Sequence, residues 1–339
     1  MKISLLSFMR LSLISSFFVG PYSNAAEENR TSFMTIEEIV VTAQKREESI
    51  NDVGMSIQAS TGERLKELGI TDAFDLYKAV AGFSSNVNYA GTAIYTIRGV
   101  GFQENSLATS PTVSVYLDEA PLQFSPMTRG ATLDVQRVEA LKGPQGTLFG
   151  QNATGGAVNF IANKPTSEFD SGVTVSYGKF GSLDVDGYVS GPINDAWGYR
   201  VALRSQTSDD WQESYVDDQE AGAKDEFAYR VILAYDDDER ARVQFTLSGF
   251  TNNSDTLRPQ LAGKISQNPI NGLNPDFLAV ALAPRKAEAA AWSPCANTNG
   301  GTPTDINQRR WDRGCEELEF DDEFVSLQVR VDYDLTDNL

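Results

Sequence analysis

Residues 170–334 alternate apolar and polar side chains with a period of two, and this pattern restricts the fold more than any other feature of the chain. In the last such segment one face carries only apolar and aromatic side chains: Val325, Leu327, Val329, Val331 and Tyr333. Segments of about ten residues with one apolar face, one polar face and aromatic residues near the ends are typical of transmembrane β-barrels. A soluble β-sandwich also alternates, but arginine at the centre of the polar face on strand after strand favours the barrel.

The alternation predicts six strands, at about residues 171–179, 182–192, 196–206, 226–236, 241–250 and 323–334. Their connections alternate in length. Residues 194–195 and 236–239 are short turns, whereas residues 207–224 and 251–321 are long loops. Outer-membrane barrels have short periplasmic turns and longer external loops, so the connections agree with the strand pattern.

The first 25 residues are predicted to be a removable export signal. Lys2 and Arg10 are its only charges, an apolar Ser-rich run follows, and Ser23 and Ala25 fit the small-x-small pattern of a cleavage site after Ala25. The apolar run is too short to span a bilayer, and no later segment approaches 18 apolar residues. The sequence therefore predicts an exported soluble protein or an outer-membrane β-barrel.

Composition excludes several function classes. The net charge is −19, which disfavours nucleic-acid binding because that function needs a basic face. The chain contains no histidine and two cysteines, which almost excludes a His or Cys metal site and a Ser-His-Asp or Cys-His nucleophile. We therefore expect no catalytic residue, no metal and no cofactor. Cys295 and Cys315 lie in the longest loop, and an exported chain meets an oxidising space, so a disulfide between them is expected.

Residues 53–165 show a mixed pattern of helix and strand signals. Short helices are predicted after Thr61 and after Asp72. Strands are predicted at about residues 55–60, 93–98, 113–117, 136–141 and 157–162. Together these elements predict one compact α+β domain in front of the alternating region.

A glycine-rich stretch precedes the last of these strands: Gly143, Gly146, Gly150, Gly155 and Gly156. Its spacing fits neither the G-x-x-x-x-G-K-[ST] phosphate loop nor a G-x-G-x-x-G loop that opens a helix. Tight turns with positive φ, or a close approach of two backbones, are the remaining explanation.

The segment Glu38–Ala43 (EIVVTA) is rich in β-branched residues and lies between polar stretches. Two interpretations stay open from the residues alone. It is either a strand that pairs with the sheet edge of another protein, or an edge strand of the following domain.

Several segments resemble the TonB-dependent outer-membrane receptors. EIVVTA (Glu38, Ile39, Val40, Val41, Thr42 and Ala43) is similar to their TonB box. TIRG at residues 96–99 and VYLD at residues 115–118 resemble strands of their plug domain, and VEALKGPQGTLFG from Val138 to Gly150 resembles its most recognisable stretch. The resemblance is dense over residues 38–170 and rests on pattern alone in the barrel part.

The resemblance implies an α+β plug domain followed by a transmembrane antiparallel β-barrel. The expected division is a signal peptide at residues 1–25, a periplasmic arm with the TonB box at 26–52, the plug at 53–167 and the N-terminal part of the barrel at 168–339. It further implies that Gly99 and the five glycines above serve packing and turning in the plug. Among four charged plug residues (Arg98, Arg137, Glu139 and Lys142), some are expected to form ion pairs with charged residues of the inner wall, such as Arg200, Arg204 or Glu226.

The implied function is active uptake of a scarce extracellular small ligand, a ferric siderophore by family frequency. The implied partners are TonB with its ExbB/ExbD complex at residues 38–43, and outer-membrane lipid. Counted over residues 39–165, the plug has about 127 residues and needs a barrel of about 22 strands. Six strands are too few, so we expect this chain to be a truncated fragment of a longer receptor. A surface binding or adhesion barrel without transport is the alternative, and a secreted enzyme is a weaker third hypothesis.

Overall fold

The computed structural model describes residues 40–42, 46, 48–87, 93–102, 111–150, 152–214, 220–237, 240–256, 289–290 and 320–334. The chain divides into two units, Met1–Glu38 and Ile39–Leu339. The expected signal peptide and the expected Cys295–Cys315 disulfide lie outside the described residues. Everything below concerns the second unit.

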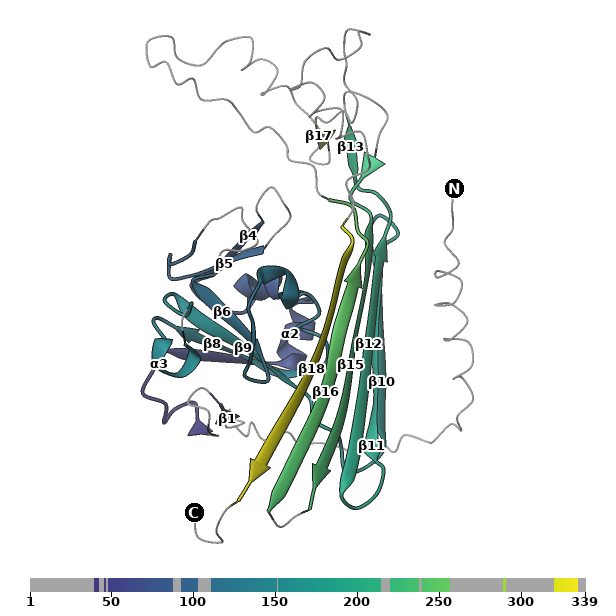
Figure 1. Cartoon of the computed structure of the whole chain (residues 1–339). Helices are drawn as coiled ribbons and strands as arrows, with labels where there is room; N and C mark the ends of the chain where they lie inside the picture. Colours follow the sequence, from purple (N-terminus) through teal and green to yellow (C-terminus); the bar gives the residue numbers. More distant parts are fainter. Residues whose placement is uncertain are drawn as a thin grey trace, which may run out of the picture. The chain divides into compact units, whose positions relative to one another are not determined.

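A five-stranded mixed sheet forms the centre of the N-terminal domain, by which we mean residues 40–165, and its strand order is β3-β8-β9-β6-β7 (Figure 1). Its strands are β3 (Ile57–Thr61), β6 (Val113–Leu117), β7 (Ala120–Leu122), β8 (Val135–Lys142) and β9 (Gly156–Ala162). All 7 residues of β9 are buried. The segment AVNFIA, apolar except for Asn159, lies at the centre of the sheet, where β9 pairs antiparallel with β8 and parallel with β6.

Short helices and one hairpin accompany this sheet. Helix α2 (Gly62–Glu67) starts at Thr61, whose hydroxyl accepts a hydrogen bond from the Arg64 amide, as the sequence predicts. The second predicted helix is a 3₁₀ helix, η1 (Ala73–Lys78), capped by Asp72. The remaining elements are β4 (Phe83–Val87), which pairs with β5 (Ala93–Ile97), then η2 (Ser125–Thr128), and α3 (Gly146–Phe149) inside the glycine-rich stretch.

The apolar sides of these helices bury against the sheet. Leu65 of α2 and Leu76 of η1 belong to one buried cluster with Val138 of β8 and Phe160 of β9. Burying a leucine or phenylalanine side chain stabilises a fold by about 1.5–3 kcal/mol. This cluster therefore fixes β8, which carries Arg137, Glu139 and Lys142, and β9, which begins at Gly156.

Six long strands form a separate antiparallel sheet in the order β10-β11-β12-β15-β16-β18 (Figure 1). They are β10 (Asp170–Tyr177), β11 (Leu183–Pro192), β12 (Trp197–Ser208), β15 (Lys224–Asp236), β16 (Ala241–Asn252) and β18 (Asp322–Tyr333). The six predicted strands are confirmed. The short strands β13 (Gln212–Ser214), β14 (Glu220–Ala221) and β17 (Ala289–Ala290) pair with one another in a small sheet of their own.

The two faces of the six-stranded sheet differ as the alternation requires. One face exposes apolar side chains such as Leu327, which is 69% exposed, whereas Arg200 and Arg230 on the other face are buried. The register places Arg230 of β15 beside Ala202 of β12. In the part of the chain that the structure describes, no helix is long and apolar enough to cross a membrane.

Candidate functional site

The polar face of the six-stranded sheet forms a buried ion pair with the N-terminal domain through Arg200 of β12. Its guanidinium donates to both carboxylate oxygens of Asp134, at 2.6 Å and 2.7 Å, and both side chains are almost fully buried. The ring of Tyr188 lies 4.1 Å from the guanidinium carbon. Asp134 has a φ of +48° and also accepts a hydrogen bond from the Asn163 side chain at 2.8 Å. The ion pair is thus bidentate, and its acceptor is held rigidly.

Two further arginines of the same face donate to main-chain carbonyl groups. Arg204 donates to the Thr71 carbonyl at 3.0 Å and to the Thr132 hydroxyl at 3.1 Å. Arg230, which is 2% exposed, donates to the carbonyls of Leu133 and Ala131. Carbonyl acceptors bind a buried guanidinium without neutralising it, so these contacts fix position and leave positive charge at the interface. Nε of Arg204 and of Arg230 is buried without a hydrogen-bond partner among the described residues.

Apolar contacts fill the centre between these arginines. Leu133 of the N-terminal domain packs with Ala202, Ala228 and Phe250 of the six-stranded sheet. Gly130 has a φ of +70°, and a Cβ atom there would lie 3.2 Å from that of Ala228. The turn at residues 130–134 therefore lies directly on the sheet, and both its polar and its apolar groups have partners there.

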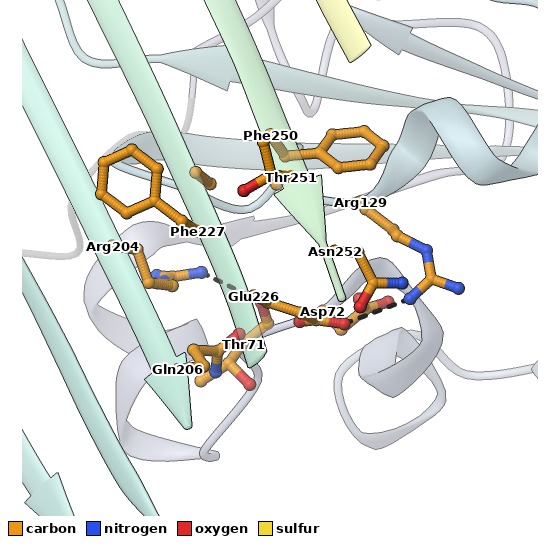
Figure 2. Close-up of a pocket in the computed structure, with 12 residues that line it drawn as sticks. Thr71, Asp72, Arg129, Arg204, Gln206, Glu226, Phe227, Phe250, Thr251 and Asn252 are labelled. Atoms are coloured by element: carbon orange, nitrogen blue, oxygen red, sulfur yellow. Dashed lines mark hydrogen bonds and ion pairs between the residues drawn. The ribbon is translucent and has the colours of Figure 1, made fainter. Parts of the chain in front are cut away.

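A small hollow lies beside this turn, lined by Thr71, Asp72, Arg129, Gly130, Arg204, Gln206, Glu226, Phe227, Ala228, Phe250, Thr251 and Asn252 (Figure 2). Arg129 of the N-terminal domain reaches Glu226 of β15 at 3.1 Å and Asp322 of β18 at 3.9 Å. Lys224 also pairs with Glu226, at 3.1 Å. Burial is the main cause that raises the pKa of the Asp72 carboxyl above its usual range, and Glu226 adds to it, while the Phe74 amide, Lys224 and Arg129 oppose it.

The arrangement is suited to holding two parts of a protein together. Its charged groups are engaged with one another or with main-chain groups. Among the described residues there is no group of three or more His, Cys, Asp or Glu side chains that could hold a metal ion. The site is a polar interface between the N-terminal domain and the six-stranded sheet.

The predicted partner-binding segment is only partly described. Val40–Val41 form strand β1, which pairs antiparallel with β2 (Glu48–Ser49). Thr42 contacts Glu139 through its amide and its hydroxyl. Glu38, Ile39 and Ala43 lie outside the described residues.

The four charged residues that we expected at the wall have partners within the N-terminal domain. Arg98 donates to the Ser56 hydroxyl at 2.6 Å, and Lys142 donates to the Gln58 side chain at 2.8 Å. Arg137 pairs with Glu139 at 2.8 Å. Partial burial, and then the Arg98 guanidinium, lower the pKa of the Lys142 ammonium.

The expected wall residues Arg200, Arg204 and Glu226 do contact the N-terminal domain, but their partners there are Asp134, Thr71, Thr132 and Arg129. Sequence reasoning missed these partners and also Arg230. Arg230 could have been found, because it lies at the centre of the polar face of a predicted strand. Asp134 and Arg129 lie in turns and carry no pattern that would identify them.

The predicted glycines lie in turns or at close contacts of the N-terminal domain. Gly156 has a φ of +150°, and a Cβ there would lie 2.3 Å from the Leu141 carbonyl oxygen; one at Gly155 would lie 2.8 Å from that of Val100. Positive φ also occurs at Gly99, Gly143 and Gly150. Gly146 differs, because it has open space around it and begins α3.

Comparison with known proteins identifies both parts of the chain. Residues 49–157 match the family described as TonB-dependent Receptor Plug Domain. The pesticin receptor of Yersinia pestis is 33% identical over 192 residues, which cover 53% of this chain and 27% of that protein. The iron-regulated outer membrane virulence protein of Vibrio cholerae serotype O1 is 26% identical over 196 residues, covering 55% of this chain and 30% of that protein. The vitamin B12 transporter BtuB of Vibrio vulnificus is 23% identical over 288 residues, covering 83% of this chain and 44% of that protein.

Solved structures agree with these relatives. The ferric yersiniabactin uptake receptor FyuA from Yersinia pestis superposes with a TM-score of 0.55 at 26% identity, over 59% of this chain and 32% of that one. The ferripyoverdine receptor of the outer membrane of Pseudomonas aeruginosa has the same fold, with a TM-score of 0.53 at 19% identity, over 69% of this chain and 31% of that one.

The chain spans between about a quarter and a half of the length of these curated relatives. The Vibrio cholerae relative and the Pseudomonas aeruginosa receptor are outer-membrane proteins, in agreement with the predicted outer-membrane location. The chain therefore contains a TonB-dependent receptor plug domain followed by part of a barrel, and the proteins it is similar to are TonB-dependent outer-membrane receptors.

Proposed function

We propose that this protein takes up a scarce extracellular ligand across the outer membrane with energy delivered through TonB. The observation that carries the proposal is the buried interface in which Arg200 holds Asp134. A plug domain matched by its family is seated on the polar face of a sheet whose other face exposes apolar side chains. This is the arrangement that a gated pore in a lipid bilayer requires.

This proposal assigns one function to each segment of the chain. Residues 1–25 direct export, residues 26–52 form a periplasmic arm, residues 53–167 block the pore, and residues 168–339 contribute strands to its wall. The expected disulfide between Cys295 and Cys315 would tighten the longest loop.

Residues 38–43 are proposed to bind TonB, which the ExbB/ExbD complex energises from the inner membrane. Adding an extended segment to the sheet edge of a partner gives affinity through main-chain hydrogen bonds and specificity through alternate side chains. Val40 and Val41 are already extended and paired with β2, which supports the proposal that this segment can serve as a strand.

The proposed cargo is a ferric siderophore. Two similar proteins support this choice by their descriptions, the ferric yersiniabactin uptake receptor and the iron-regulated virulence protein. Cobalamin is the competing cargo, because a vitamin B12 transporter aligns with the largest share of this chain among the relatives described above.

Uptake by cells tests the proposal directly. The protein is expressed from its own gene in a Gram-negative strain that lacks its own siderophore and cobalamin receptors. Radiolabelled ferric siderophores of several chemical types and labelled cyanocobalamin are offered in turn, with and without TonB. We expect uptake of one ferric siderophore that disappears when TonB is deleted. Uptake of cobalamin alone would show that the cargo is cobalamin and not a ferric siderophore. Ligand binding without any TonB-dependent uptake would favour the adhesion alternative.

A further inference from the structure

Two carboxyl groups meet where the long connections leave the six-stranded sheet. Asp210 lies just beyond the end of β12, and Asp255 lies just beyond the end of β16. The register places the ends of these two strands at the same edge of the sheet, beside the start of β15. The pair therefore lies outside the strands, between the segment that follows β12 and the segment that follows β16.

Both side chains bind main-chain amides of one short segment. Oδ2 of Asp255 accepts hydrogen bonds from the amides of Gly222 at 3.0 Å and Ala223 at 3.2 Å. Oδ1 of Asp210 accepts a hydrogen bond from the same Ala223 amide at 3.2 Å. The Asp255 amide donates to the Ala223 carbonyl at 2.9 Å. One amide group is thus shared by two carboxyl groups that come from different connections.

The segment that carries the shared amide has little freedom to follow a carboxyl group that moves. Gly222 has a φ of +97°, and a Cβ atom there would lie 2.5 Å from the indole nitrogen of Trp211. The Trp211 amide donates to the Ala221 carbonyl at 3.0 Å. Residues 221–223 are therefore fixed beside Trp211, and separation of the two carboxyl groups would break a hydrogen bond to them.

Two carboxylates at one amide repel each other unless they hold a proton between them. Partial burial is the main cause that raises the pKa of the Asp210 carboxyl above its usual value. The hydrogen bond to Asp255 and the charge of Asp255 come next, Glu220 adds to them, and the Ala223 amide opposes the shift. Because the two groups interact strongly, the proton belongs to the pair and not to either residue.

The described charged side chains around the pair are acidic, apart from one lysine. The register places Glu220 of β14 opposite Glu213 of β13. The Lys224 ammonium pairs with Glu226 at 3.1 Å and donates to Gln206 at 3.2 Å, so its charge is directed to other groups. A shared proton is therefore what offsets the repulsion between the two carboxyl groups. The titratable side chains on the described elements beside the pair are Asp209, Glu213, Glu220, Lys224 and Asp225.

We propose that Asp210 and Asp255 form a proton-dependent clasp between the segment that follows β12 and the segment that follows β16. The clasp is closed while the pair holds one proton, and it opens when the proton leaves and both carboxylates are ionised. In the proposed receptor both segments lie outside the cell, so external acidity would keep the clasp closed. This orientation rests on the proposed function, but the clasp itself is measured on the purified chain without ligand or TonB.

The direction of the pH dependence follows from proton binding. The closed clasp binds the proton more tightly than the open one, because only in the closed state do the two carboxyl groups share it. Closure is therefore favoured below the raised pKa of the closed pair and is lost as pH rises through it. A difference of about one pKa unit between the two states changes the closure equilibrium about tenfold.

Hydrogen–deuterium exchange of the Gly222, Ala223 and Asp255 amides in the full chain, purified in detergent, measures the clasp. Protection factors, which correct for the intrinsic effect of pH on exchange, are compared at about pH 5 and about pH 7.5. In D210N the new side-chain amide can donate to Asp255 while its carbonyl oxygen accepts from Ala223, so this variant should stay closed at both pH values. The control is D209N, which changes the neighbouring carboxylate, one that lies against Gly181.

We expect the wild-type protection of these three amides to fall about tenfold from the lower to the higher pH, and the protection in D210N to stay constant. D209N should behave like the wild type. Constant protection in the wild type would overturn the proposal, as would an equal fall in D210N or constant protection in D209N. Should D210N not fold, D255N decides, because it also removes one carboxylate of the pair. Its protection should not depend on pH, and a fall like that of the wild type would show that the clasp is wrong.

Discussion

Arg200 of strand β12 donates hydrogen bonds to both carboxylate oxygens of Asp134, at 2.6 Å and 2.7 Å, and both side chains are almost fully buried. One bidentate ion pair thus joins the six-stranded sheet to the turn of the plug that lies on it. A pair this deeply buried stabilises the contact only while both partners are present, because either charge alone would be costly in the interior.

Replacing Asp134 by alanine should therefore lower the free energy of unfolding by about 3–5 kcal/mol, since the Arg200 guanidinium would remain buried without its counter-ion. Chemical denaturation of the detergent-solubilised chain measures the loss. The control is D334A, which breaks the pair of Arg242 and Asp334, 3.3 Å apart and half exposed on both sides. That pair should contribute no more than about 1 kcal/mol. Equal losses in the two variants would show that the Arg200 contact is not an anchor.

An alanine side chain should destabilise the protein at position 156 but not at position 146. In G156A the new Cβ would meet the Leu141 carbonyl oxygen at 2.3 Å, and the residue would keep a φ of +150°. We expect a loss of about 2–4 kcal/mol from overpacking and backbone strain. G146A adds a methyl group into open space at the start of α3, so it should be neutral or stabilising by up to about 1 kcal/mol. Urea midpoints of the two variants decide, and similar midpoints would contradict the assigned close contact.

Asp72 should make stability fall as pH rises. Burial is the main cause that holds the pKa of its carboxyl above the usual value in the folded chain. Between the unfolded and the folded pKa the native state binds more protons, so the free energy of unfolding decreases with increasing pH. D72N keeps an N-cap acceptor for η1 but cannot ionise. The variant should be more stable than the wild type at pH 7, and the difference should vanish below about pH 4.

Unfolding curves between pH 4 and pH 8 test this prediction. The control is D75N, which changes the carboxyl that pairs with Lys78 on the same helix. If the difference in free energy of unfolding between the wild type and D72N is the same at every pH, burial does not disfavour the ionised Asp72 carboxyl.

The sequence predicted the six long strands closely because alternation is a strong local signal. Strand β18 was expected at residues 323–334 and is found at Asp322–Tyr333. Strands β4 and β7 were missed for local reasons as well. Phe83–Val87 is mostly polar, and Ala120–Leu122 contains Pro121. The second helix was found, but its 3₁₀ form depends on packing that a sequence does not show.

The interface was only half predictable. Arg200 and Arg204 could be assigned to the wall because they alternate with apolar residues on a predicted strand. Their partners could not, because Asp134 adopts a φ of +48° in a turn and Thr71 offers only its carbonyl. Every residue has a main-chain carbonyl, so the sequence does not show which carbonyl accepts a hydrogen bond from an arginine. A turn brings together groups whose pairing depends on tertiary structure.

The apolar face of the six-stranded sheet should tolerate no charge. Leu327 of β18 points to that face and is 69% exposed, whereas its neighbour Gln328 points to the polar face, where the register places it opposite Thr246. If the apolar face contacts lipid, L327R should cost about 2–4 kcal/mol near the centre of the bilayer. Q328R, with the same new side chain one residue away, should cost less than about 1 kcal/mol. Denaturant titration in lipid vesicles and trypsin resistance of the outer-membrane fraction measure both variants. Equal losses of stability at the two positions would mean that the exposed apolar face does not contact lipid. An arginine is costly only on the side of the strand that faces hydrocarbon, so lipid contact requires L327R to be worse than Q328R.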